Sequence, residues 1–376
     1  MNIESFDVLE SVLGHIRLLK LRIPERGSIS LGGYTNNILL KNSLFKLSND
    51  ILFLFIGKKS ELFMENFIKK IDFFSFIDVD HNLDEHFCFN IYEYIENRRS
   101  LDLDLKDNLL HKVKSGLIVS STWDGVGGGL FPYITSKLME WRIDSIPIAL
   151  IPSPEQPSDA HFNSISSIAM CINKGCYPIF IINRDLLEDY VGVDRKGYLI
   201  KGGMILNEIL ELMLSKEGFV NDFMRFSKYF DIKLYTILIS TGCSLKIYDS
   251  LENIFNSMLY RMLLNFDLKE SYIFYVLARI PVKLRGEITK EKLESAFIRW
   301  IREKSSPKVI YISDPIFINE VNDRIDIMII VGGFNEEKIL NSLEEKARET
   351  IEYLTKKGII DEVKLKDILS LVNHDL

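Results

Sequence analysis

The chain has 376 residues, of which 47% are hydrophobic and 26% are charged, and its net charge is -7. This composition excludes a disordered chain, its length predicts two domains, and its negative charge argues against nucleic-acid binding. The sequence has no apolar run of the ~18–20 residues that span a bilayer and no signal-peptide pattern, so we expect a cytoplasmic protein without a transmembrane segment.

The first half of the sequence alternates predicted strands and helices. An amphipathic helix is predicted at 4–21, and the region 78–100 is too polar to assign. Strands are predicted at 28–31, 51–56, 116–120, 146–151 and 177–182, and helices at 33–45, 61–71, 107–114, 132–141 and 162–174. Because the strands are continuous apolar runs, the pattern predicts a doubly wound, mostly parallel sheet that is covered on both faces.

A long helix at 204–214 separates this half from a region of different character. Strands are predicted at 233–240, 272–280, 308–315 and 324–332, with a helix at 290–304 whose N-cap is Thr289. The pattern indicates a second α+β domain with a mixed sheet. A charged, amphipathic helix is predicted at 335–371. The four cysteines, Cys88, Cys171, Cys176 and Cys243, form no CxxC pair and are predicted to be reduced and buried.

A glycine cluster carries the strongest chemical signal. Gly125, Gly127, Gly128 and Gly129 stand between a buried strand and a helix, where backbone N–H groups and the helix N-terminus can hold a phosphate. A tight turn without a ligand is the alternative. The cluster is neither a P-loop nor a dinucleotide fingerprint, because Leu130 stands where the latter needs Gly or Ala.

Several segments together resemble the FtsZ/tubulin superfamily in their order and spacing. GLIVSSTWDGVGGGLFPYI at 116–134 resembles the strand, the glycine-rich signature loop and the helix start of that superfamily, and SLGGYTNN at 30–37 resembles its first phosphate loop. IFIINRDLL at 179–187, NEIL at 207–210 and the strand pair at 308–334 follow in the family order. On this resemblance the chain is identified as a divergent member, of an archaeal FtsZ-like or tubulin-like kind.

The resemblance implies a GTP/GDP site at the strand ends. Gly32, Gly33 and Asn37 would line the α-phosphate, while Gly125, Gly127, Gly128 and Gly129 would hold the diphosphate. Gln156 stands at the ribose-contacting position, and Asn183 and Asn207 would bind the guanine edge, since their amides offer both donors and acceptors. Catalysis would be completed in trans by Asn221, Asp222 and Arg225, from the loop after the central helix.

The sequence also departs from the family pattern. The signature GGGTGTG reads WDGVGGG at 123–129, so both threonine hydroxyls are absent, and Asp124 places a carboxylate near the expected phosphates unless Mg²⁺ bridges them. The second acidic catalytic position falls on Arg225 or Phe226, and neither can act as a base. These departures predict weak or absent GTP hydrolysis.

The resulting hypothesis is a guanine-nucleotide-binding protein that assembles head-to-tail with itself in a cytoskeletal or cell-division role. The expected parts are an N-terminal helical extension (1–25), a nucleotide-binding domain (26–203), a central helix (204–215), a second domain (216–334) and a helical tail (335–376). The terminal helices could dock a protein partner. Two alternatives stay open: a pseudo-GTPase scaffold that binds no nucleotide, and a dinucleotide-dependent oxidoreductase, against which the missing GxGxxG argues.

Overall fold

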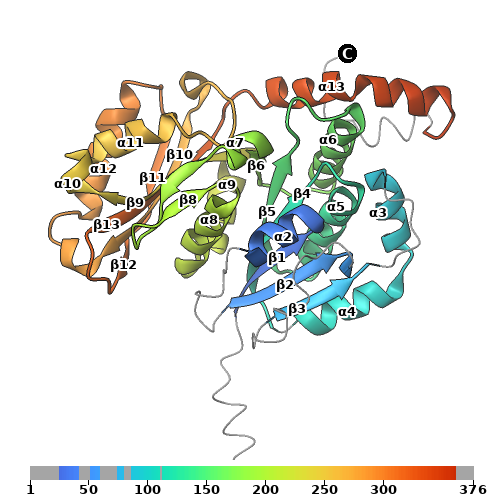
Figure 1. The fold of residues 1–376 in the computed structure, drawn as a ribbon, viewed down its shortest axis with the longest axis horizontal. Helices are drawn as coiled ribbons and strands as arrows, with labels where there is room; N and C mark the ends of the chain where they lie inside the picture. Colours follow the sequence, from blue (N-terminus) through green and yellow to red (C-terminus); the bar gives the residue numbers. More distant parts are fainter. Residues whose placement is uncertain (1–24, 42–50, 60–73, 80–85, 111, 361–376) are drawn as a thin grey trace, which may run out of the picture.

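The computed structural model describes residues 25–41, 51–59, 74–79, 86–110 and 112–360 (Figure 1). The helices predicted at 4–21 and 61–71 lie outside the described residues. Within these ranges, none of the helices has the length and apolar character that crossing a bilayer requires.

One sheet runs through the described part of the chain, in the order β11-β10-β13-β9-β6-β5-β4-β1-β2-β3, with β12 paired to β10. In the N-terminal half all neighbouring strands are parallel, as predicted. These strands are β1 (Arg26–Leu31), β2 (Ile51–Gly57), β3 (Phe74–Asp78), β4 (Ser115–Ser121), β5 (Asp144–Ile151) and β6 (Ile179–Asn183). Every residue of β4 is buried, which explains its uninterrupted apolar and small-residue sequence.

Helices cover both faces of this half. One hydrophobic core lies under α3 (Cys88–Glu96), α4 (Arg99–Leu109), α5 (Gly125–Glu140) and α6 (Ser158–Asn173). The other lies under α2 (Gly33–Lys41), α8 (Met204–Ser215) and α9 (Phe219–Phe230). The predicted helix at 107–114 is wrong, because α4 begins at Arg99 and ends at Leu109.

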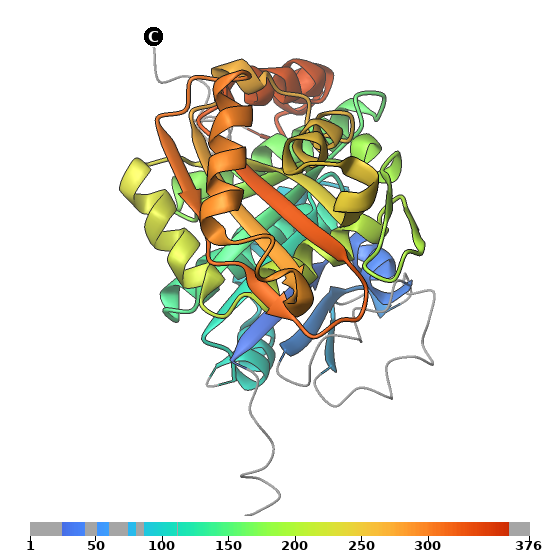
Figure 2. The ribbon, with the colours of Figure 1, turned by 90° about the vertical axis from the view of Figure 1, so that its left-hand side faces the viewer.

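The C-terminal half has the mixed sheet that the sequence predicts. β9 (Leu234–Ser244) is parallel to β6, and β13 (Arg324–Gly332) is antiparallel to both β9 and β10 (Ile273–Pro281). Two short strands, β11 (Val309–Ile312) and β12 (Ile316–Ile318), are parallel to β10. Figure 2 views this half from its outer side, with α12 (Lys290–Arg302) in front. The side chain of Thr289 caps α12 by accepting from the Lys292 N–H, as predicted.

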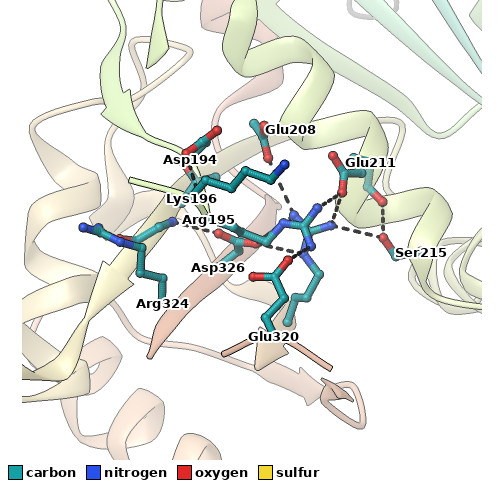
Figure 3. A network of polar contacts seen from close by, with 12 residues as sticks. Asp194, Arg195, Lys196, Glu208, Glu211, Ser215, Glu320, Arg324 and Asp326 are labelled. Atoms are coloured by element: carbon teal, nitrogen blue, oxygen red, sulfur yellow. Dashed lines mark hydrogen bonds and ion pairs between the residues drawn. The ribbon is translucent and has the colours of Figure 1, made fainter. Parts of the chain in front are cut away.

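α8 lies between the two halves, and buried charges join it to the C-terminal sheet (Figure 3). Arg279 on β10 is 2% exposed, and its guanidinium contacts Asp326 on β13 at 2.7 Å and Glu211 on α8 at 2.7 Å. Arg195 contacts Glu211 and also Glu320, the latter at 2.7 Å. The short strands β7 (Val191–Val193) and β8 (Leu199–Lys201) flank Arg195. This network fixes the central helix against the second half of the sheet.

The C-terminal helix α13 (Glu336–Lys356) packs along α6 and crosses the top of the molecule in both views (Figures 1 and 2). Lys346 Nζ donates to the Pro154 carbonyl at 2.8 Å, and the Thr350 N–H donates to Ser158 Oγ at 3.0 Å. The part of the predicted helix beyond residue 360 lies outside the described residues. The four cysteines are free and buried, in line with the prediction.

Candidate functional site

Four loops lie at the carboxyl edge of the parallel strands, where ligands of open α/β sheets bind. β1, β4, β5 and β6 are adjacent and parallel, so the residues that follow their last positions share one edge. This places Gly32 and Gly33 after β1, the glycine cluster after β4, Gln156 after β5 and Asn183 at the end of β6. Asn37 lies in α2, behind the first of these loops.

The glycine cluster is helical, whereas we predicted a loop with the helix starting at Pro132. α5 begins at Gly125, and Asp124 is its N-cap. Asp124 Oδ1 accepts the Gly127 N–H, Asp124 Oδ2 accepts the Ser121 hydroxyl, and the Gly128 N–H donates to the Asp124 carbonyl at 2.8 Å. The N–H groups of Gly127 and Gly128, which we had expected to hold a diphosphate, are therefore bonded to Asp124.

The three consecutive glycines are required by close packing. A Cβ on Gly128 would lie 2.8 Å from the Thr122 carbonyl oxygen and 3.0 Å from Cys88 Cβ. A Cβ on Gly129 would lie 2.6 Å from both the Cys88 carbonyl oxygen and Ile91 Cβ on α3, and one on Gly127 would overlap the Ser121 carbonyl oxygen. These side-chain positions are filled by protein atoms, so the glycine pattern by itself is explained without a ligand.

Gly32 brings the loop after β1 onto the same cap. Its φ of +84° lies in the left-handed region that favours glycine. A Cβ on Gly32 would lie 2.9 Å from Ser121 Oγ, 3.1 Å from Gly127 Cα and 3.2 Å from Asp124 Oδ2. The β1–α2 loop and the N-terminus of α5 are thus in direct contact around the Asp124 carboxylate.

Asn37 has a neighbour, Asn36, that is also fixed at the strand ends. Asn37 is only partly buried. Asn36 is fully buried, and its Nδ2 donates to the Ile56 carbonyl at 3.1 Å. Its Oδ1 accepts no hydrogen bond within the described ranges. Asn37 stays a prediction for the phosphate side, and Asn36 is a second amide at the same place.

The sequence analysis does not predict a cluster of two aromatic rings, an arginine and a glutamate at this edge. The rings of Tyr34 and Trp123 meet edge to face at 4.8 Å, and the Arg184 guanidinium lies 5.2 Å from the first and 5.3 Å from the second ring centroid. The Tyr34 hydroxyl donates to Glu188. Burial, with the Glu188 carboxylate next, raises the pKa of Tyr34, so its hydroxyl stays protonated. This cluster closes the edge between α2, the start of α5 and α7 (Arg184–Glu188).

The two candidate base-binding amides differ in whether they have hydrogen-bond partners. Asn183 caps α7: its Oδ1 accepts the Asp185 N–H at 2.9 Å and the Leu186 N–H at 3.3 Å, and its Nδ2 donates to the Pro152 carbonyl at 3.4 Å. Asn207, in the first turns of α8, is 7% exposed, and neither polar atom of its amide has a partner among the described residues. Gln156 Oε1 is likewise buried and unpartnered within that part of the chain.

The three candidate catalytic residues lie at the opposite edge of the sheet. Asn221 Nδ2 donates to Asp144 Oδ2 at 2.6 Å, and Asp144 is the first residue of β5. Asp222 and Arg225 are exposed, and their spacing of three residues places them on one side of α9. One molecule therefore does not bring these residues together with the glycine cluster.

A cavity of about 580 Å³ lies beside the strand ends, between α6, α13 and the segment 262–270. It shares Pro152 and Asn183 with the edge described above, and His161 also lines it. His161 is 1% exposed. Burial first, and then the charge of Lys346, lowers the pKa of His161, so the imidazole stays neutral at pH 7.

Comparison with known proteins resolves the architecture. No family model and no curated protein matches the sequence. Among solved structures, CetZ from Methanosaeta thermophila superposes with a TM-score of 0.66 at 13% identity, covering 93% of this chain and 97% of that one. GDP-bound CetZ1 from Haloferax volcanii gives 0.65 at 12% identity, covering 87% and 99%. A GTPγS-form protofilament of TubZ from Bacillus thuringiensis gives 0.58 at 12% identity, covering 89% and 93%.

The chain has the FtsZ/tubulin fold. The match extends over most of the chain, so both halves and α8 belong to this architecture. It confirms the predicted fold class, which is a mostly parallel sheet with a central helix and a second, mixed sheet. Because the identities are 12–13%, the likeness establishes the fold alone.

Proposed function

We propose that this protein binds a guanine nucleotide and assembles head-to-tail with itself, in a cytoskeletal or cell-division role and without efficient hydrolysis. This proposal rests mainly on one observation, which is that the candidate site is divided into two parts at opposite edges of one sheet. The strand-end loops and Asn207 form one part, and Asp222 with Arg225 forms the other. Two copies stacked along the strand direction would bring these parts together, and CetZ2 and TubZ were each solved as a protofilament with GTPγS.

The base side of the proposed pocket fits a purine. Each buried polar group without a hydrogen bond lowers the stability of a folded protein by roughly 1–3 kcal/mol. The Asn207 amide has both a donor and an acceptor that are buried and unpartnered among the described residues. The edge of guanine offers the complementary acceptor and donors, so a bound base relieves this cost. Guanine is the base that we propose, because CetZ1 and CetZ2 were solved with GDP and GTPγS.

The phosphate side does not fit in the conformation described here. The Asp124 carboxylate already bonds to the Gly127 N–H, and Gly32 packs against it. A diphosphate would add two or more negative charges to the same place, which is unfavourable unless the carboxylate moves away or a cation lies between. We therefore derive no phosphate-transfer step.

The other edge supports weak or absent hydrolysis. The Asn221 amide donates to Asp144, and the second acidic position of the family pattern falls on Arg225 or Phe226. Asp222 is then the acidic residue of the segment 218–226 that could face a neighbouring subunit. Arg225, in place of the second acid, cannot deprotonate water. We propose the same division as predicted, with residues 26–203 binding the nucleotide, 204–215 as the central helix and 216–334 contacting the next subunit.

One observation favours a second candidate, a scaffold that assembles without nucleotide. The N-terminus of α5 is capped by the protein's own carboxylate, because Asp124 accepts the Gly127 N–H. Such a protein would keep the two assembly edges and lose the ligand.

Two measurements separate these functions. The purified protein is denatured, and the released small molecules are resolved on an ion-exchange column. Sedimentation is then measured with GTP, with GDP and without nucleotide. The proteins compared are the wild type, Arg225→Glu and the control Lys356→Glu, which changes an exposed residue of α13. Guanine nucleotide in the released fraction and GTP-dependent pelleting that only Arg225→Glu abolishes support the proposal. An empty protein that pellets equally in all conditions supports the scaffold, and no pelleting under any condition contradicts both.

A further inference from the structure

The position of Asp124 at the start of α5 is unusual for a site that is to receive phosphates. Its carboxylate accepts from the backbone N–H of Gly127 and from the hydroxyl of Ser121. These donors, at the positive end of a helix of 16 residues, are the kind of group that binds an external anion. The anion found there belongs to the protein itself.

Two further features hold the carboxylate in this place. Gly32, in a left-handed conformation, lies so close that a Cβ added at this position would be 3.2 Å from Asp124 Oδ2. Ser120 Oγ donates to the Gly127 carbonyl at 2.8 Å and so fixes the first turn of α5 from below. The carboxylate is therefore enclosed by donors and backbone from β1, β4 and α5.

From these contacts we infer that Asp124 is an internal competitor of the nucleotide phosphates, which lowers the affinity of the pocket by occupying its anion position. This inference rests on the proposed function and concerns the regulation of the same site. A phosphate group entering the N-terminus of α5 must displace the carboxylate and then meets its charge at short range. Removing that charge while keeping the cap should strengthen nucleotide binding.

Two variants separate the charge from the occupied volume. Asp124→Asn keeps an oxygen that accepts the Gly127 N–H and removes the charge, whereas Asp124→Gly empties the position. Both residues are good N-caps, so α5 is retained, which circular dichroism verifies. Asp189→Asn is the control, because it removes one negative charge from an exposed position after α7 and leaves α5 unchanged.

The experiment is a calorimetric titration of GDP, and separately of inorganic pyrophosphate, into the wild type and the three variants. We expect Asp124→Asn and Asp124→Gly to bind GDP at least tenfold more tightly than the wild type, and Asp189→Asn to equal the wild type. Equal GDP affinity in all four proteins would overturn the inference and leave the proposed function standing.

Failure of the proposed function gives a different pattern. If no protein in the set binds GDP, pyrophosphate decides the inference. Pyrophosphate binding by Asp124→Gly and not by the wild type would uphold the internal competitor in a protein that does not bind nucleotide. No pyrophosphate binding by either Asp124 variant would overturn it.

Discussion

Replacing Arg279 by Met tests whether the buried charge network holds α8 against the C-terminal sheet. The substitution keeps most of the apolar side chain and removes the guanidinium that contacts Asp326 at 2.7 Å and Glu211 at 2.7 Å. At an effective dielectric constant of 20, one such contact amounts to roughly 6 kcal/mol before desolvation is subtracted. Breaking a buried pair from one side costs about 3–5 kcal/mol, because the remaining charge stays buried. Asp326 is fully buried, so we expect a loss in this range.

The assay is urea unfolding followed by circular dichroism, with Arg299→Met as the matched control. Arg299 also pairs with a carboxylate, that of Glu252, but its side chain is 68% exposed, so its loss should cost less than ~1 kcal/mol. The double variant Arg279→Met/Asp326→Asn should recover part of the loss, since Asn keeps an acceptor for the Gly242 N–H that Asp326 binds at 2.8 Å. Equal losses for Arg279→Met and Arg299→Met would refute the reasoning.

Three further predictions concern neighbouring features. Burial, Glu211 and Asp326 raise the pKa of Glu208 to about 7. Because the folded protein then binds this proton more tightly than the unfolded chain, the free energy of unfolding should fall by up to ~3 kcal/mol as pH rises from about 4.5 to about 7. Glu208→Gln should flatten this part of the stability–pH curve. Gly129→Ala should lower the free energy of unfolding by about 1–3 kcal/mol, because its Cβ would lie 2.6 Å from Ile91 Cβ. The control Gly286→Ala should change it little, because nothing lies within 4 Å of the added Cβ. Similar unfolding curves for the two variants would contradict the packing argument. Asn207→Leu should raise the stability of the ligand-free protein, because it removes two unpartnered buried groups. The same substitution should weaken GDP binding at least tenfold. Unchanged GDP affinity in a titration would show that Asn207 does not contact the base.

The fold was largely predictable because its parallel strands are continuous apolar runs. The errors arose where a second rule competes with apolar periodicity. The glycines before Pro132 are predicted as a phosphate-binding turn ahead of the helix, but tight packing on α3 selects them inside the first turns of α5. α4 was misplaced although Leu101, Leu105 and Leu109 recur every four residues and are all buried, which is a helical signal that polar neighbours obscured.

The candidate site was predictable only in its outline. The strand ends that carry Gly32, the glycine cluster and Asn183 follow from the parallel topology, whereas the role of Asp222 stays a prediction. The contacts of Tyr34 with Trp123 and Arg184 join three loops that are distant in sequence, so no local pattern indicates them. The capping role of Asn183 depends on the turn into α7, which propensity does not specify.

The central claim is that the pocket at the carboxyl edge binds a guanine nucleotide. Calorimetric titration of GTP and GDP into the purified, folded protein with Mg²⁺, with ATP as the control, tests it most directly. We predict guanine binding in the micromolar range, which corresponds to roughly -8 kcal/mol, and ATP binding at least tenfold weaker. The absence of any nucleotide binding in protein shown to be folded and free of bound nucleotide, or equal binding of ATP and GTP, would contradict the claim.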